Sequence, residues 1–144
     1  MDKPFSISDS YKININGLNF SNSHNNNIHV ITVSDKAEVA IDVAEFKDKN
    51  KQIYNKFYEN HPPIYRIKKD PKKEFYMNWI LYEISVKLNF HSKEIYKMVN
   101  FLYFHKNIIG YTKVADNFCI TNLNFEMVIK EMSDILKNPA EYGS

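Results

Sequence analysis

The sequence predicts an α+β fold, in which an N-terminal antiparallel hairpin of two or three strands packs on a core of about four helices. Three observations support this prediction. Apolar and polar residues alternate on both sides of Asn16-Gly17, and four later segments space their apolar residues by three and four positions. The chain has 144 residues, 44% of them hydrophobic, which suits one domain with a buried core. We expect a β-rich part (1–34), a helical part (35–138) and a tail (139–144).

The hairpin is predicted over residues 11–20. Ile13 and Ile15 alternate with polar residues before the turn, and Leu18 and Phe20 alternate after it. Asn-Gly is the dipeptide that two-residue hairpin turns favour, because both of its positions need a positive φ. The β-branched residues of segment 28–33 then predict a third strand.

A first helix is predicted over residues 35–59. Ser34 or Asp35 can cap it, and Glu38 follows three positions after Asp35. Its apolar face is formed by Val39, Val43, Phe46, Ile53 and Phe57. Residues 38–43 also alternate between apolar and polar, so a second interpretation makes them a strand.

The second helix has the clearest boundaries. His61-Pro62-Pro63 ends the preceding helix, Asp70 can cap the next one, and Pro71 suits its first position. We expect it to reach Leu88. One side carries Phe75, Trp79, Tyr82 and Val86, and another carries Met77, Leu81, Ile84 and Leu88. Because it is apolar nearly all round, it is expected to be the central, most buried helix.

Two further helices complete the prediction. The third begins at Ser92, buries Ile95, Val99, Leu102 and Ile109, and ends at Gly110. Residues 111–121 are irregular, with room for a small hairpin around Asp116-Asn117. The fourth helix opens at Asn122 or Asn124 and ends at Asn138-Pro139. Its apolar stripe consists of Phe125, Val128, Ile129, Met132, Ile135 and Leu136.

Composition bears on the source and the compartment. Asn, Lys, Ile, Tyr and Phe make up about half of the chain, and lysine outnumbers arginine 18 to one. These residues share AT-rich codons, so an AT-rich genome is expected, such as that of a phage, a large DNA virus, an endosymbiont or a low-GC bacterium. The single cysteine, Cys119, is read as a buried thiol and excludes a disulfide framework. No signal pattern or apolar run of membrane length occurs. We expect an intracellular protein, in host cytoplasm or a virion, without membrane contact.

The sequence contains no recognisable enzyme site. The three glycines are far apart, no G-x-S-x-G occurs, and the five histidines and Cys119 lack metal-ligand spacing. We therefore predict no catalytic, cofactor or metal site.

Positive charge is concentrated between Lys47 and Lys73. This stretch, the basic belt, holds nine basic and three acidic residues, a net +6 in a chain of net +2. Three interpretations stay open: a phosphate-facing patch, a contact with an acidic partner or neighbouring copy, and a solvated surface of a lysine-rich chain. The residues expected to contact a partner or phosphate are Lys51, Lys56, Arg66, Lys68, Lys69, Lys72 and Lys73.

The segment Ile80–Asn100 resembles the opening of HU/IHF-like proteins, in which two helices meet at a short turn before Lys93-Glu94. Residues 118–125 fall about where that family has its glycine-bearing strand motif, so the resemblance covers residues 75–125. The glycines of that motif and the basic arm are missing, so DNA bending is not implied. The resemblance implies a relation to phage virion ring or connector proteins, including those of crAss-like phages.

We therefore expect a non-enzymatic structural protein of a phage or virus, a ring or connector type that assembles through protein–protein contacts as a homo-oligomer or with other virion proteins. Six tyrosines are expected at such contacts: Tyr54, Tyr58, Tyr65, Tyr76, Tyr96 and Tyr103. The alternative is a nucleic-acid-binding accessory protein that uses the basic belt and a helical pair over residues 75–109. Its DNA-reading positions are Lys93, Tyr96, Lys97 and Asn100 on the third helix.

Overall fold

The N-terminal hairpin forms as the sequence predicts. A computed structural model describes residues 12–15, 17–26, 28–35, 37–112, 117–122 and 127–131. Strand β1 (Lys12–Ile15) pairs antiparallel with β2 (Leu18–His24), and Gly17 supplies a φ of +81° at the turn. The predicted third strand is also confirmed, as β3 (Ile28–Ser34) pairs with β2.

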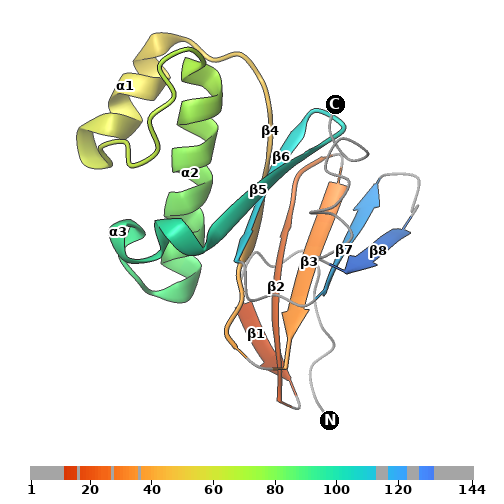
Figure 1. The fold of residues 1–144 in the computed structure, drawn as a ribbon. Helices are drawn as coiled ribbons and strands as arrows, with labels where there is room; N and C mark the ends of the chain where they lie inside the picture. The colour runs from red at the N-terminus through yellow and green to blue at the C-terminus, as the bar shows by residue number, and fades with distance from the viewer. Residues whose placement is uncertain are drawn as a thin grey trace.

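The sheet that contains this hairpin continues with strands from the other end of the chain. Strand β7 (Asn117–Asn122) pairs with β3, and β8 (Met127–Glu131) pairs with β7, which gives the order β1-β2-β3-β7-β8 (Figure 1). The fourth helix, predicted from Asn122 or Asn124 to Asn138, is therefore wrong over residues 127–131, and residues 123–126 and 132–138 lie outside the described part. Pairing of β8 with β7 overrides the helical spacing, since strand preference depends on cross-strand neighbours.

A second antiparallel sheet has the order β4-β6-β5 and consists of β4 (Ile41–Glu45), β5 (Val99–Phe104) and β6 (Asn107–Thr112). The long helix over residues 35–59 is thus wrong in its first half, and the strand interpretation is correct for residues 41–43. The remainder forms α1 (Lys51–Asn60), capped by the Asn50 side chain, which accepts from the Ile53 amide. Val39, Ile41 and Val43 face one core and Ala40 the other, as strand geometry requires.

The third predicted helix is also corrected. Only α3 (Ser92–Ile95) and one 3-10 turn (Tyr96–Met98) are helical, and β5 and β6 follow as a hairpin. The cap of α3 is His91, with Glu94 completing a capping box, rather than Ser92. Gly110 ends no helix but lies inside β6. The small hairpin predicted around Asp116-Asn117 falls partly outside the described residues, since residues 113–116 are not among them; β6 and β7, which flank that segment, belong to different sheets.

The second helix is confirmed at both ends. Helix α2 (Pro71–Leu88) begins after Asp70, whose carboxylate accepts from the Lys73 amide, and stops at Asn89, which has a φ of +58°. One face of α2 packs against the three-stranded sheet through Ile80 and Ile84, both fully buried.

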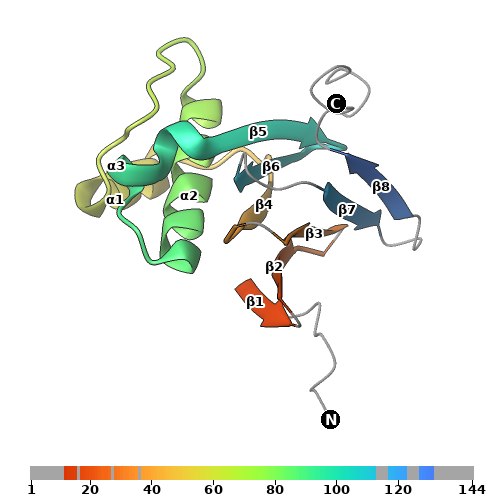
Figure 2. The ribbon, with the colours of Figure 1, turned by 60° about the horizontal axis from the view of Figure 1, so that its bottom comes forward.

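The molecule has three layers (Figure 2). The five-stranded sheet packs on one face of the three-stranded sheet, where Val30, Ile41 and Ile109 belong to one apolar core. The helices cover the other face, where Phe57, Leu81 and Ile108 belong to a second core. The hairpin therefore does not pack on helices as predicted, because the three-stranded sheet lies between them.

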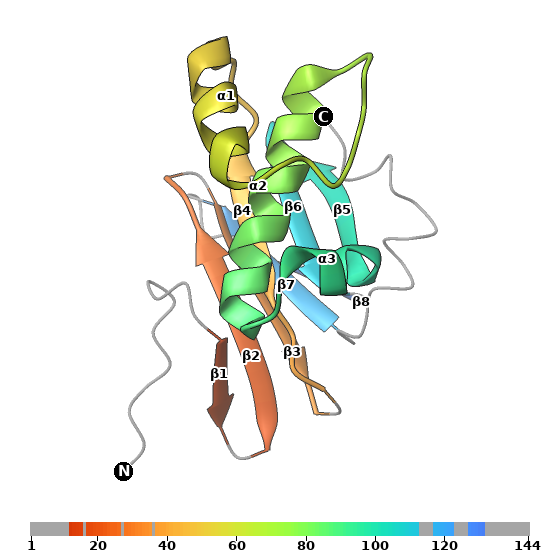
Figure 3. The ribbon, with the colours of Figure 1, turned by 90° about the vertical axis from the view of Figure 1, so that its left-hand side faces the viewer.

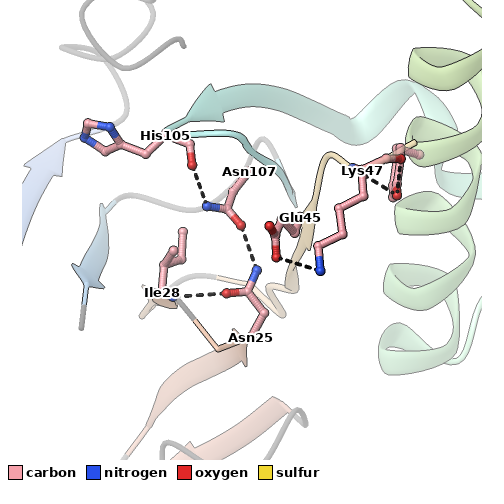
Figure 4. A network of polar contacts seen from close by, with 7 residues as sticks. Asn25, Ile28, Glu45, Lys47, His105 and Asn107 are labelled. Carbon is pink, nitrogen blue, oxygen red and sulfur yellow. Dashed lines mark hydrogen bonds and ion pairs between the residues drawn. The ribbon is translucent and has the colours of Figure 1, made fainter. Parts of the chain in front are cut away.

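Two asparagine side chains, those of Asn78 and Asn25, join neighbouring segments through hydrogen bonds. The segment between α1 and α2 crosses over α2 (Figure 3), where the buried Asn78 side chain accepts from the amides of Ile64 and Tyr65 and donates to the Tyr65 carbonyl. At one end of the two sheets, the side-chain Nδ2 of Asn25 donates to the side-chain Oδ1 of Asn107 at 2.7 Å (Figure 4). This hydrogen bond joins the β2–β3 and β5–β6 turns.

The β5–β6 turn offers a stability test. His105 and Lys106 both have positive φ, 45° and 65°, a conformation that costs residues with a β-carbon about 1–2 kcal/mol each. The double substitution of His105→Asn with Lys106→Gly should therefore raise the free energy of unfolding, measured in urea, by about 1 kcal/mol. The control is Lys106→Ala, which keeps the β-carbon and should bring no gain. Equal gains in both variants would contradict this account.

Candidate protein-interaction surface

An apolar stripe lies on the outer side of α2. Trp79, Tyr82 and Val86 follow one another at spacings of three and four, and Phe90 continues the stripe just past the helix end. Trp79 is 37% exposed, Val86 58% and Phe90 52%. The stripe is the side of α2 that the sequence assigned to the core, so the expectation of a helix buried all round holds only for the face that carries Ile80 and Ile84.

Phe90 directly follows the residue that ends α2. Asn89 adopts the left-handed conformation, its amide donates to Val86 O, and the Phe90 amide donates to Ser85 O. This is the Schellman arrangement, in which the residue at the Phe90 position ordinarily packs back on the last turn of the helix. Here that side chain stays half in solvent, so closing the helix does not account for it.

A groove of about 710 Å³ runs beside this stripe. Its volume lies in the range of sites that bind small molecules or peptide side chains. Its lining includes the buried Leu81 with Tyr82 and Val86 from α2, and His61 and Pro62 from the segment after α1. The His61 and Tyr82 rings are 4.1 Å apart between centroids. The remaining lining residues are Phe57, Asn60, Ile64, Asn78, Ser85, Asn89, Phe90, His91, Ser92 and Lys93.

The described residues that line the groove include His61, His91 and Lys93 and no Asp or Glu. The Glu94 carboxylate accepts from the His91 amide at 3.0 Å, so an acidic group lies directly beside this lining. Sequence reasoning missed this site because its residues come from α1, α2 and the turn before α3. The sequence signal that could have indicated it is the apolar side of α2 that carries Trp79, Tyr82 and Val86.

The basic belt does not form a single free surface. Lys51, Lys56, Arg66, Lys68 and Lys69 are exposed, on α1 and the segment before α2. Lys72 and Lys73 are half-buried: the Lys72 ammonium lies 3.0 Å from the Asp48 carboxylate and 4.5 Å from the centre of the Phe46 ring. The Lys73 ammonium lies 5.6 Å from the centre of the Tyr103 ring. These two lysines thus serve intramolecular packing.

The predicted DNA-reading helix is not formed. Lys93 lies in α3, Tyr96 and Lys97 in the 3-10 turn, and Asn100 in β5, where it is half-buried. These four positions therefore do not share one exposed helix face. The quoted HU/IHF-like segment spans the second half of α2, the turn, α3 and the start of β5.

The six tyrosines expected at contacts are largely used inside the molecule. Tyr76 is 3% exposed, and the other five are half-buried. The Tyr65 hydroxyl donates to the Tyr96 carbonyl at 2.6 Å, and the Tyr76 hydroxyl donates to the Lys47 carbonyl at 2.9 Å. Burial raises the pKa of Tyr58 to about 12, and the nearby Glu74 carboxylate adds to this shift. The exposed aromatic surface is instead formed by Trp79 and Phe90.

A buried charged network lies where β2, β4 and α2 meet. The Lys87 ammonium donates to the carbonyls of Ile41 (2.6 Å) and Asn22 (3.0 Å), and lies 3.9 Å from the Asp42 carboxylate. Burial raises the pKa of Asp42 to about 6, while Lys87 and a hydrogen bond from the Ser23 hydroxyl oppose the rise. The Ser21 and Ser23 hydroxyls accept from the amides of Ile41 and Val43. The network seals the open edge of β4, so we assign it a structural role.

His24 and His29 lie opposite each other on β2 and β3, with ring centroids 4.8 Å apart. In the part of the chain that the structure describes, no three His, Cys, Asp or Glu side chains are grouped as metal ligands. Among the same residues, no helix has the length and apolar content needed to span a membrane. The side chain of Cys119 lies outside the described set.

Comparisons with known proteins give no further identification. No protein-family model matches the chain, and neither a curated protein nor a solved structure is significantly similar to it.

Proposed function

We propose that this protein is a non-enzymatic assembly protein that works through protein–protein contacts, with the outer side of α2 as its contact surface. The observation that carries the proposal is the exposure of Trp79 and Val86 on one side of α2 and of Phe90 just past its end. Apolar groups contiguous on a surface mark interaction sites, and aromatic residues are enriched at the centres of interfaces. The skewed composition and the HU/IHF-like segment support a phage or viral setting for the assembly.

The proposal commits to a second copy of the chain as the first partner. An identical helix placed antiparallel across a two-fold axis would pair the stripe with itself, as closed dimers do. For nucleic-acid binding, the described residues of the basic belt provide exposed positive charge, but the predicted DNA-reading helix is not formed. Protein contact is therefore the function that the geometry favours.

Native mass provides the test. The 17.1 kDa chain should form a discrete oligomer in size exclusion with light scattering, at low and at high salt, because salt screens contacts between charges and not the burial of apolar surface. Val86→Lys combined with Phe90→Lys should return it to the monomer mass, because each places a charge in the contact. Met98→Lys, at another exposed apolar residue (42%), is the matched control and should leave the oligomer intact. A monomer at both salts would contradict self-assembly through this face.

A further inference from the structure

We propose that the paired histidines His24 and His29 bind a divalent transition-metal ion, of the class that includes Zn²⁺, Cu²⁺ and Ni²⁺, on the outer face of the five-stranded sheet. His24 lies in β2 and His29 in β3, and their Cα atoms are direct partners in the antiparallel register. Five positions separate them in the sequence, a spacing that matches no metal-binding motif. Only the pairing of the two strands brings the imidazoles together.

Both imidazoles lie on the face of the sheet that points away from the three-stranded sheet. Ile28 and Val30, the neighbours of His29 in β3, belong to the core between the two sheets, so His29 points the opposite way. His24 points the same way as His29, because direct cross-strand partners share a face. His24 is exposed and His29 is half-buried, so an ion can reach the pair from solvent. The helices cover the other side of the molecule (Figure 2), so this site is independent of the contact surface on α2.

The strand register brings the two rings to the separation of ligands that share one ion. The adjacent pair toward the turn is joined by a backbone hydrogen bond from the Asn25 amide to the Ile28 carbonyl, so His24 and His29 form a non-hydrogen-bonded pair, in which side chains are closest. Their ring centroids are 4.8 Å apart, and the ring planes are inclined by 46°. Two imidazoles with nitrogens about 2.1 Å from one ion have centroids about 4.5–5 Å apart when the ligand angle is between a right angle and tetrahedral.

The chemistry of the pair suits this class of ion. Imidazole nitrogen is a ligand that Zn²⁺, Cu²⁺ and Ni²⁺ share, whereas Mg²⁺ and Ca²⁺ prefer oxygen. Burial lowers the pKa of His29, and the neighbouring His24 lowers it further, which favours the neutral ring that binds metals. The Cβ–Cγ torsion of histidine has a broad energy minimum, so a small turn of each ring directs a nitrogen at the shared ion.

The pair supplies two ligands, and the remaining positions are open to solvent ligands. Within the described residues, no third His, Cys, Asp or Glu side chain joins the two histidines as a group of metal ligands. Water therefore completes the coordination, as it does in zinc sites that keep an open position. Two ligands on adjacent strands still bind as a chelate, because the second imidazole binds the ion intramolecularly once the first has bound it.

Isothermal titration calorimetry of the full chain with zinc chloride tests the site, with magnesium chloride as the comparison ion. Zn²⁺ should bind at about one ion per chain, and Mg²⁺ should not compete with it. His24→Gln and His29→Gln should each weaken Zn²⁺ binding by roughly tenfold or more, because each removes the chelate. His91→Asn is the matched control: His91 is an exposed histidine before α3, asparagine can keep its capping hydrogen bond, and Zn²⁺ binding should stay unchanged.

Proton NMR of the imidazole rings locates the ion in the parent chain, so this readout does not depend on the stability of a variant. On addition of Zn²⁺, the ring resonances of His24 and His29 should move, and those of His61 and His91 should stay constant. Urea unfolding without metal separates a loss of binding from a loss of fold in the two glutamine variants. Equal Zn²⁺ affinity in these variants and the parent chain, shifts confined to other histidines, or the absence of saturable binding would each overturn the inference.

Discussion

Lys87→Met is expected to lower the free energy of unfolding by about 3–5 kcal/mol, the range for breaking a buried charged network. The Lys87 side chain is 5% exposed, and its ammonium is the donor for the carbonyls of Asn22 and Ile41. Methionine fills a similar volume without donating, so two buried carbonyls lose their partner and the Asp42 carboxylate loses its nearest cation. Urea unfolding measures the loss, and Lys93→Met, at an exposed lysine, should stay within about 0.5 kcal/mol of the parent chain.

The same network predicts a dependence on pH. Burial raises the pKa of Asp42 from 3.8 to about 6 in the folded protein, so the folded state binds this proton more tightly than the unfolded chain does. The stability that this proton contributes is fully present below pH 4 and is lost as the pH rises through 6. The difference between a pKa of 3.8 in the unfolded chain and about 6 in the folded protein corresponds to roughly 3 kcal/mol. Asp42→Asn should therefore gain about that much relative to the parent chain between pH 4 and pH 7.

Glu83 interacts electrostatically with both Asp42 and Lys87. Burial raises the pKa of Glu83 as well, and Lys87 opposes the rise. Protonation of Glu83 therefore changes stability with pH in the same direction as protonation of Asp42. Glu83→Gln is therefore the control: it should leave most of the Asp42-dependent change in place. A constant stability difference between Asp42→Asn and the parent chain across this pH range would contradict the role assigned to Asp42.

Gly110→Ala is expected to destabilise the protein by about 2–3 kcal/mol, although alanine suits strands better than glycine in general. A β-carbon at this position would overlap the Cγ2 of Ile80 and lie 3.1 Å from the Phe101 ring. Ile80 is fully buried in the core between α2 and the three-stranded sheet, so it cannot move aside without displacing the helix. Thermal and urea unfolding of the variant measure the effect.

A double-mutant cycle separates this crowding from other effects. Ile80→Ala removes the atom that the new β-carbon would meet, so the two substitutions together should cost at least about 1 kcal/mol less than the sum of the single ones. Gly17→Ala is the comparison at a glycine of a different kind: its φ is +81°, and nothing lies within 4 Å of the added carbon. It should cost about 1 kcal/mol through backbone strain alone. Additive effects of Gly110→Ala and Ile80→Ala would contradict close packing of α2 on β6.

The elements that sequence reasoning recognised carry their own boundary signals. Asp70-Pro71 begins α2, and its Asp70 cap forms as the pattern predicts. Asn16-Gly17 marks the first hairpin, where Gly17 has the positive φ that the turn needs. Such signals depend on backbone conformation over a few residues, so they can be read before any tertiary contact is known. The groove could not be read in this way, because its walls come from segments about thirty residues apart.

The β5–β6 hairpin shows why the third helix was predicted wrongly. Its turn consists of His105 and Lys106, which have positive φ although neither is a residue type typical of such turns. The apolar residues on both sides of the turn also fit helical spacing. What selects the strands is pairing: Leu102 lies opposite Ile109, and β4 adds to the other side of β6. The sequence by itself determined the mixed α+β class, the first hairpin with its third strand, and the limits of α2. Tertiary structure decided the two-sheet arrangement, the fate of residues 41–45 and 99–112, and which side of α2 faces solvent, because strands and exposed helix faces are selected by partners distant in sequence.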